Sequence, residues 1–167
     1  MSQNAAQNDD FAFADGIKEQ FIQDYGVAYQ SFGLPRLMGY IVGLLLYHKD
    51  PISLTQITDE LSVSKGPVSQ IMRSLREHGL VERVWVPGSR RDYYRSVPDI
   101  FGKAFGNHAS LLLSNRVLAR RFKDLIKTTD EDIPENFKAT VDEMERFYTM
   151  MEKHLSAFLT EWNETKD

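Results

Sequence analysis

The sequence predicts a mainly helical protein with one small β-hairpin near its centre. Apolar residues recur at helical spacing over most of the 167 residues. Residues 81–86 and 92–97 are instead rich in β-branched and aromatic side chains, with a Pro-Gly pair between them. Ser53 and Ser64 each precede a short amphipathic stretch, as helix N-caps do. We therefore expect two short helices and a hairpin, flanked by longer helices on both sides.

The N-terminal part should contain two helices. Residues 1–10 are polar and acidic, and we expect them to be disordered. Apolar residues at helical spacing predict a helix from residue 11 to about residue 31, and we assign residues 11–34 to an N-terminal dimerisation helix. Pro35 can open the next helix, which is apolar nearly all round and should form a buried spine.

The two short helices carry clear boundary signals. Ser53 and Gln56 have the spacing of a capping box. Ser64 is the next N-cap, and Gly79 suits the left-handed residue that ends a helix. Only residues 62–63 remain between the helices, so they must cross steeply, which is the helix-turn-helix arrangement.

The second short helix has a polar face that suits DNA. Gln and Arg side chains can pair with adenine and guanine edges in the major groove. After the hairpin turn at Pro87-Gly88 come two arginines, and a hairpin with a cationic tip behind a helix-turn-helix is a wing that can reach phosphates or the minor groove. An ordinary solvated surface is the alternative interpretation of both features. The polar face consists of Lys65, Gly66, Ser69, Gln70, Arg73 and Glu77, and the tip carries Arg90 and Arg91.

Charge is distributed unevenly along the chain. The net charge is −4, which by itself argues weakly against nucleic acid. Residues 62–97, however, hold seven cations and three acids, a net charge of +4, whereas residues 130–167 hold four cations and eleven acids, a net charge of −7. Local charge decides what a surface attracts, because screening limits its reach to about 10 Å. The central segment is therefore the candidate for a polyanionic partner.

Two long helices should follow the hairpin. Pro98 can open a helix that runs to about residue 128, in which Asn115 is either an exposed residue or a polar residue that fixes helix register. The last helix keeps a strict 4-3 apolar spacing from Phe137 onward, and a seam of this kind needs a partner helix. We expect a second chain to supply it. The predicted dimer interface is Val141, Met144, Tyr148, Met151, Leu155, Phe158 and Trp162.

Residues 33–105 resemble the GbsR-type branch of the MarR-like winged-helix transcriptional regulators. The most specific pieces are GLPRLMGYIVGLL, LSVSKGPVSQIMRSL and VPGSRRDYY. The resemblance implies a dimeric repressor. It also supports an interpretation of several aromatic residues as a cage for a cationic or zwitterionic effector such as choline or glycine betaine. Core and hairpin packing is the other interpretation of these aromatic residues. They are Tyr40, Trp85, Tyr93 and Tyr94.

We therefore predict a winged helix-turn-helix DNA-binding domain at residues 35–97 and a C-terminal helical dimerisation region at residues 98–167. A homodimer would bind a palindromic site on double-stranded DNA, with half-sites ~34 Å apart. Phosphate contacts are expected from Ser53, Ser64, Lys65 and Arg91. Base contacts are expected from Ser69, Gln70 and Arg73, with Gly66 and Arg90 in the same interface.

Other function classes find less support. The sequence has no cysteine, no Gly-x-Ser-x-Gly motif and no glycine-rich phosphate loop, so we expect no enzyme and no cofactor. The four histidines lack metal-site spacing, and no metal is expected. An enzyme could only use helical carboxylates, for which the candidates are Glu143, Glu145 and Glu152, and solvated helix faces flanking the apolar seam are the favoured interpretation of these residues.

The absence of a signal pattern or long apolar run suggests a cytoplasmic protein without a membrane partner. The alternative function is a winged helix that contacts other proteins through its acidic C-terminal helices. Such a module would show no sequence preference on DNA.

Overall fold

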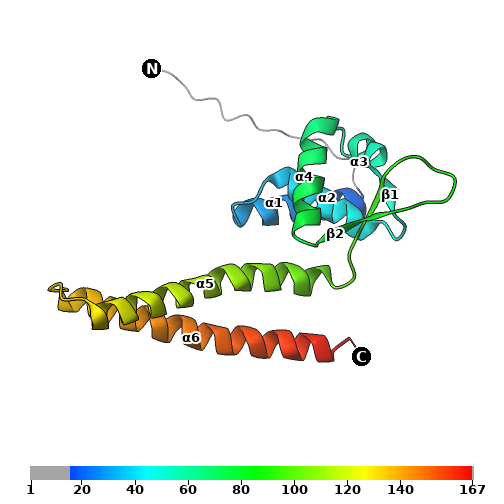
Figure 1. Cartoon of the computed structure of the whole chain (residues 1–167). Coiled ribbons are helices and arrows are strands. Elements are labelled where there is room, and N and C mark those ends of the chain that lie inside the picture. Colours follow the sequence, from blue (N-terminus) through cyan, green and yellow to red (C-terminus); the bar gives the residue numbers. More distant parts are fainter. Residues whose placement is uncertain (1–15, 167) are drawn as a thin grey trace, which may run out of the picture. The chain divides into compact units, whose positions relative to one another are not determined.

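The computed structural model describes residues 16–166 and divides the chain into two compact units, Met1–Val97 and Pro98–Asp167. The expected disorder of residues 1–10, and the start of the predicted N-terminal helix, lie outside the described residues. The fold is mainly helical with a small antiparallel sheet (Figure 1), which confirms the predicted fold class. The elements are α1 (Ile17–Ser31), α2 (Arg36–Tyr47), β1 (Ile52–Ser53), α3 (Leu54–Glu60), α4 (Lys65–Glu77), β2 (Val81–Val84), β3 (Tyr93–Ser96), α5 (Ile100–Thr128) and α6 (Glu135–Glu164).

The first unit is built on α2, which is buried as its apolar sequence predicts. Residues 39–45 of this helix are all buried. Helix α1 crosses it at very short range, because a Cβ atom at Gly39 would lie 2.5 Å from the carbonyl oxygen of Tyr25 and 2.7 Å from the Cα of Gly26. Glycine is therefore required at the point where the two backbones meet. The first unit thus includes α1 as well as the helices and strands that follow α2.

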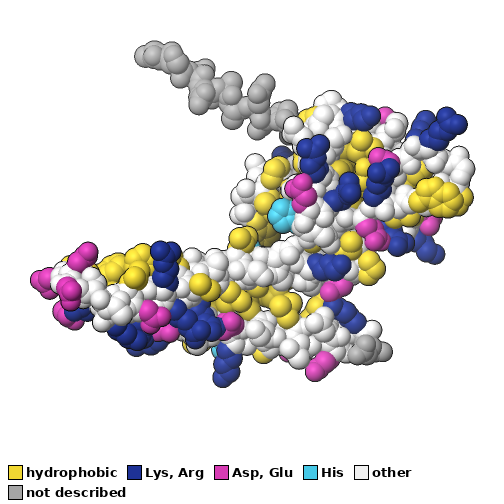
Figure 2. Space-filling view, in the orientation of Figure 1, with side chains coloured by type: hydrophobic (Ala, Val, Ile, Leu, Met, Phe, Trp, Pro, Cys, Tyr) yellow, Lys and Arg dark blue, Asp and Glu magenta, His cyan; other side chains and the backbone are white. Residues whose placement is uncertain are grey.

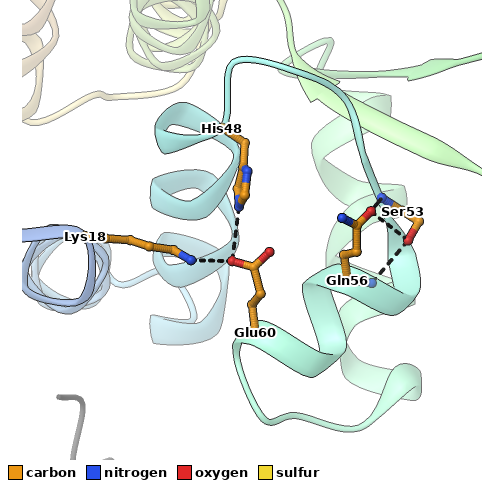
Figure 3. Close-up of polar contacts among 5 residues, drawn as sticks. All are labelled: Lys18, His48, Ser53, Gln56 and Glu60. Atoms are coloured by element: carbon orange, nitrogen blue, oxygen red, sulfur yellow. Dashed lines mark hydrogen bonds and ion pairs between the residues drawn. The ribbon is translucent and has the colours of Figure 1, made fainter. Parts of the chain in front are cut away.

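The helix-turn-helix consists of α3 and α4. Ser64 occupies the predicted N-cap position of α4 without a side-chain capping hydrogen bond, and the other boundary signals are confirmed. The backbone N–H of Gln56 donates to the Ser53 hydroxyl oxygen at 3.2 Å, and the Ser53 N–H donates to the Gln56 side-chain oxygen at 2.9 Å (Figure 3). This is the predicted capping box. Gly79 ends α4 with φ 67°, and the Leu80 N–H donates to the Leu75 carbonyl at 2.9 Å, as in a Schellman motif.

The sheet contains the predicted hairpin and one further strand. Strand order is β1-β3-β2, and both pairings are antiparallel. Gly88 has φ 79°, and the Ser89 N–H donates to the Val86 carbonyl at 3.2 Å, which is the predicted type II turn. The two residues of β1 were not predicted, because so short a strand has no periodicity and is stabilised only by pairing with β3.

The second unit is a hairpin of the two long helices, α5 and α6. Helix α5 starts at Ile100, and its N-cap is Asp99 in the left-handed conformation, rather than Pro98 as predicted. The seam of α6 is covered by α5 of the same chain: the Asn115 amide donates to the Tyr148 hydroxyl at 3.1 Å, and the rings of Phe105 and Phe158 lie 4.7 Å apart. The sequence predicts a second chain in this role, whereas α5 of the same chain packs against the seam. The polar side chain of Asn115 therefore forms its hydrogen bond between α5 and α6 of one chain.

Candidate nucleic-acid interface

Helix α4 separates an apolar face from a polar one. Val68, Met72 and Leu75 are at most 2% exposed and hold the helix on the core. Helical spacing turns the residues between them outward. Most of the residues predicted to contact DNA are exposed here, with Ser69 half-buried, and the exposed ones are Ser64, Lys65, Gly66, Gln70 and Arg73. Donors for bases and phosphates are therefore presented together on a supported helix.

The hairpin is held by ion pairs along its two strands. The Arg83 guanidinium pairs with the Asp92 carboxylate, and the Arg95 Nε lies 2.6 Å from the Glu82 Oε1. Both pairs cross from β2 to the returning arm. Arg90 and Arg91 lie beyond them and are exposed. The internal pairs neutralise the arginines of the arms and leave those of the tip available to a partner.

Seven cations in residues 16–97 have no ion-pair partner among the described residues, and five of them lie on α4 and the hairpin tip. The acids of residues 62–97 are Glu77, Glu82 and Asp92. Of these, Glu77 is the one without an ion-pair partner in the described chain. Figure 2 shows Lys and Arg side chains spread over this part of the first unit. Sequence reasoning counted Arg76 only as a charge, although its position three residues after Arg73 puts it on the exposed side of α4. The unpaired cations of α4 and the hairpin tip are Lys65, Arg73, Arg76, Arg90 and Arg91, and the other two, Arg36 and Lys49, belong to α2 and the turn after it.

Ser53 does not belong to this interface. We predicted a phosphate contact, but Ser53 is 2% exposed and both its hydroxyl and its N–H are bonded to Gln56. A phosphate oxygen cannot reach a hydroxyl that is buried and already used as a helix cap. The capping signal and the DNA-contact signal are the same residue type at the same place in a helix, which is why the sequence could not separate them.

An ion-pair cluster anchors α3 to the helices behind it. The Glu60 carboxylate at the end of α3 receives Lys18 of α1, and it lies 3.1 Å from the Nε2 of His48 after α2 (Figure 3). Partial burial acts to raise the pKa of Glu60, but the hydrogen bonds and charges of Lys18 and His48 outweigh it and lower that pKa. The cluster therefore ties the helix-turn-helix to α1 and α2 through one ionised carboxylate.

The four predicted effector residues have different environments. Tyr40 and Tyr94 are 6% and 7% exposed, whereas Trp85 is 77% exposed and Tyr93 is half-buried. The Tyr40 hydroxyl donates to the Gln23 side-chain oxygen at 3.0 Å, and the Arg36 guanidinium carbon lies 5.5 Å from the centre of its ring. The Tyr40 ring thus already interacts with a cation of the chain itself.

The carboxylates considered for an enzyme site lie in the second unit. Glu145 pairs with Lys123 at 2.6 Å and Glu152 pairs with Arg116, so both serve to join α5 and α6. Glu143 is exposed. Across the described residues, we find neither a group of three His, Asp or Glu side chains that could hold a metal ion nor a helix suited to crossing a membrane.

Comparison with known proteins agrees with this geometry. The MarR family model matches residues 32–92, which run from the end of α1 to the hairpin tip. The protein YvaV of Bacillus subtilis, named as an HTH-type transcriptional regulator, is 21% identical over 83% of this chain and 81% of its own length. A crystal structure described as a transcriptional regulator has 26% sequence identity and a TM-score of 0.72, and the alignment covers 88% of this chain and 98% of that one.

The relatives do not single out the GbsR branch. The transcriptional repressor GbsR of Bacillus subtilis is 25% identical over 60% of this chain and 55% of its own length, which is no closer a match than the others. The family model nevertheless covers the helices and hairpin that carry the unpaired cations. In its fold, its cationic winged helix and these similarities, the chain resembles the MarR-family winged-helix transcriptional regulators, and the MarR family model matches it over the winged helix.

Proposed function

We propose that two copies of this chain form a cytoplasmic repressor that binds a palindromic operator, with α4 in the major groove and the hairpin tip on the backbone or in the minor groove. The observation that carries the proposal is the set of five unpaired cations on α4 and the tip. Unpaired cations bind phosphates with release of counterions, and this favours DNA over a neutral partner. A repressor of this kind acts by occupying DNA that the transcription machinery needs.

Individual roles follow from exposure and chemistry. Gln70 and Arg73 are exposed on α4 and carry the planar donor groups that pair with base edges. Ser64 and Lys65 lie at the N-terminal end of α4, where free N–H groups and a cation favour a phosphate. Arg91, at the hairpin tip, supplies a further phosphate contact. Ser69 is half-buried and suits a short contact with a base.

The surface proposed for the dimer is the apolar edge of the α5–α6 hairpin. Leu111, Leu118 and Leu125 are 43–71% exposed and lie seven residues apart, which aligns them on one stripe of α5. Phe147 and Phe158 of α6 are 49% and 48% exposed. Burial of such a row against a second copy removes apolar area from water, and the gain grows with the area covered.

The opposite edge of the same hairpin is charged. There Arg116 pairs with Glu152, and Lys123 pairs with Glu145. Helical spacing puts these residues on the other side of their helices from the exposed leucines and phenylalanines. One edge is thus satisfied within the chain and the other is left for a partner, and a second copy provides a matching apolar edge by symmetry.

Membership of the GbsR branch and release by an effector form the finer part of the proposal. The repressor GbsR is one of the similar proteins, and the Arg36 guanidinium over Tyr40 indicates that this ring accepts a cation. Choline or glycine betaine would compete with Arg36 for Tyr40, with Tyr93, Tyr94 and Trp85 as the other candidate contacts. Isothermal calorimetry tests this: no heat with either compound at millimolar concentration, together with unchanged operator affinity, would remove the effector.

The experiment for the main proposal is a gel-shift titration of the purified protein against the DNA upstream of its own gene. A duplex of the same composition and scrambled sequence is the control. We expect a discrete shifted band with the upstream DNA at protein concentrations that leave the scrambled duplex free. Equal binding of both duplexes would instead favour a winged helix that contacts other proteins.

A further inference from the structure

Trp85 is a large aromatic side chain that the fold leaves in solvent. It follows β2 directly and is 77% exposed. Figure 2 shows hydrophobic surface beside Lys and Arg side chains at the end of the hairpin. Arg90 and Arg91, on the other arm of the same hairpin, are exposed and have no ion-pair partner in the described part of the chain. An exposed indole on a hairpin whose tip carries two unpaired guanidinium groups has the composition of a nucleic-acid contact.

Strand register gives the direction in which Trp85 points. Arg83 pairs with Tyr94, and side chains alternate along a strand, so Trp85 lies on the same sheet face as Arg83 and Tyr94. The face that carries Trp85 thus holds the buried Tyr94, and Trp85 is exposed at the end of β2.

Two ion pairs join the arms of the hairpin before any partner binds. The Arg83–Asp92 ion pair lies next to Trp85 on the same face, and the Arg95–Glu82 ion pair braces the other face. The type II turn at Gly88 closes the tip. These ion pairs join the two arms beside Trp85, and the exposed indole itself loses side-chain freedom when it is bound.

We propose that Trp85 enters the minor groove of DNA beside the half-site read by α4 and acts as an apolar wedge against a base step. This inference rests on the proposed DNA-binding function. Apolar side chains in the minor groove pry base steps apart, and cations on either side hold the phosphates while they do so. Pyrimidine–purine steps unstack most easily. The protein should therefore prefer a TA or CA step at a position that α4 does not touch.

The first test observes Trp85 directly in the full-length protein. Trp85 and Trp162 are the two tryptophans of the chain, so protein labelled with 5-fluorotryptophan gives two fluorine resonances, and the one missing from Trp85→Phe belongs to Trp85. The solvent isotope shift between H2O and D2O reports exposure of each indole. We expect the shift of Trp85 to shrink when operator DNA is added. Trp162, whose Nε1 donates to Asp99 at 2.6 Å, is the internal reference.

The second test separates the wedge from the cationic contacts. Trp85→Ala should weaken operator binding roughly tenfold, the order of a base–aromatic contact, and Trp85→Phe should restore most of it. The loss should be the same at two salt concentrations, because an indole releases no counterions. Arg91→Ala, in contrast, should reduce the dependence of binding on salt. Replacing the flanking TA or CA step by GC should weaken the wild type but leave Trp85→Ala unchanged.

The outcomes distinguish this inference from the proposed function. If the wild type binds its operator in preference to scrambled DNA while the isotope shift of Trp85 stays that of the free protein, the wedge is wrong and DNA binding stands. An unchanged affinity of Trp85→Ala on every flank has the same meaning. If the wild type shows no preference for the operator, the proposed function fails and the wedge fails with it.

Discussion

Gln70 and Arg73 are the residues on which sequence choice should depend. Both are exposed on α4 and offer a planar pair of hydrogen-bonding groups to base edges. Gln70→Ala and Arg73→Ala should each cost ~1–3 kcal/mol of binding free energy at one position of the operator and relax the preference at that position. Competition titrations with single-base operator variants measure this. An unaltered order of preference in both variants would mean that another element reads the sequence.

The Glu60 cluster should make stability depend on pH. The folded-state pKa of Glu60 is lowered from its ordinary value of 4.5, so the carboxylate contributes stability that is fully present above that value and is lost as pH falls through the folded pKa. The free energy of unfolding of the wild type should exceed that of Glu60→Gln at neutral pH, and the difference should shrink in acid. Urea denaturation across a pH series tests this, and a difference that does not vary with pH would contradict it.

At the scale of elements, the crossing of α1 and α2 depends on glycine. A Cβ atom at Gly39 would lie 2.5 Å from a backbone oxygen and 2.7 Å from a backbone carbon, and neither can move aside alone. Gly39→Ala should therefore destabilise the first unit by about 1–3 kcal/mol, the usual cost of overpacking. Chemical denaturation measures the loss.

The matched control is Gly66→Ala on α4. A Cβ atom at Gly66 would meet nothing within 4 Å, and alanine is favoured over glycine in a helix by ~1 kcal/mol. This variant should be as stable as the wild type or slightly more stable. Equal losses in the two variants would show that the α1–α2 contact is looser than the distances indicate.

Elements with local signals could be predicted from the sequence, and elements that depend on distant contacts could not. The capping box at Ser53, the glycine that ends α4 and the Pro87-Gly88 turn each depend on neighbouring residues, and all three are present. Strand β1 exists only because β3 pairs with it. Asp99 caps α5 in the left-handed conformation and also accepts a hydrogen bond from Trp162 of α6. No local pattern marks β1 or the Trp162 contact, whereas aspartate is a preferred N-cap residue and the Asp99 cap is a local signal that the assignment of the helix start to Pro98 overlooked.

The candidate site divides in the same way. Helical periodicity correctly predicts which residues of α4 face outward, because the apolar residues of this helix lie on one face and that face is buried. Burial of Ser53 depends on the packing around it, and its role as a phosphate contact was therefore wrong. The seam of α6 was recognised from its spacing, but spacing does not tell whether the partner helix belongs to the same chain. The structure gives that role to α5.

At the scale of the whole molecule, the apolar edge of α5 and α6 should hold two copies together. Leu118 lies in the middle of the exposed leucine stripe, so Leu118→Asp puts a charge into the proposed interface and should give a monomer with much weaker operator binding. Val117→Asp is the matched control, because Val117 is 71% exposed and lines the surface of α5 beside Arg116 and Glu152. Analytical ultracentrifugation should show a dimer for this control, and a dimer for Leu118→Asp would put the interface elsewhere.

The most direct test of the account is a fluorescence-anisotropy titration of the purified protein on its upstream DNA, beside the same duplex with one half-site scrambled. The account predicts saturation at two chains per duplex, a preference of roughly a thousandfold or more for the intact site, and an affinity that falls steeply with salt because the cations of α4 and the hairpin tip contact phosphates. Equal affinity for the two duplexes, or binding that does not change with salt, would contradict it.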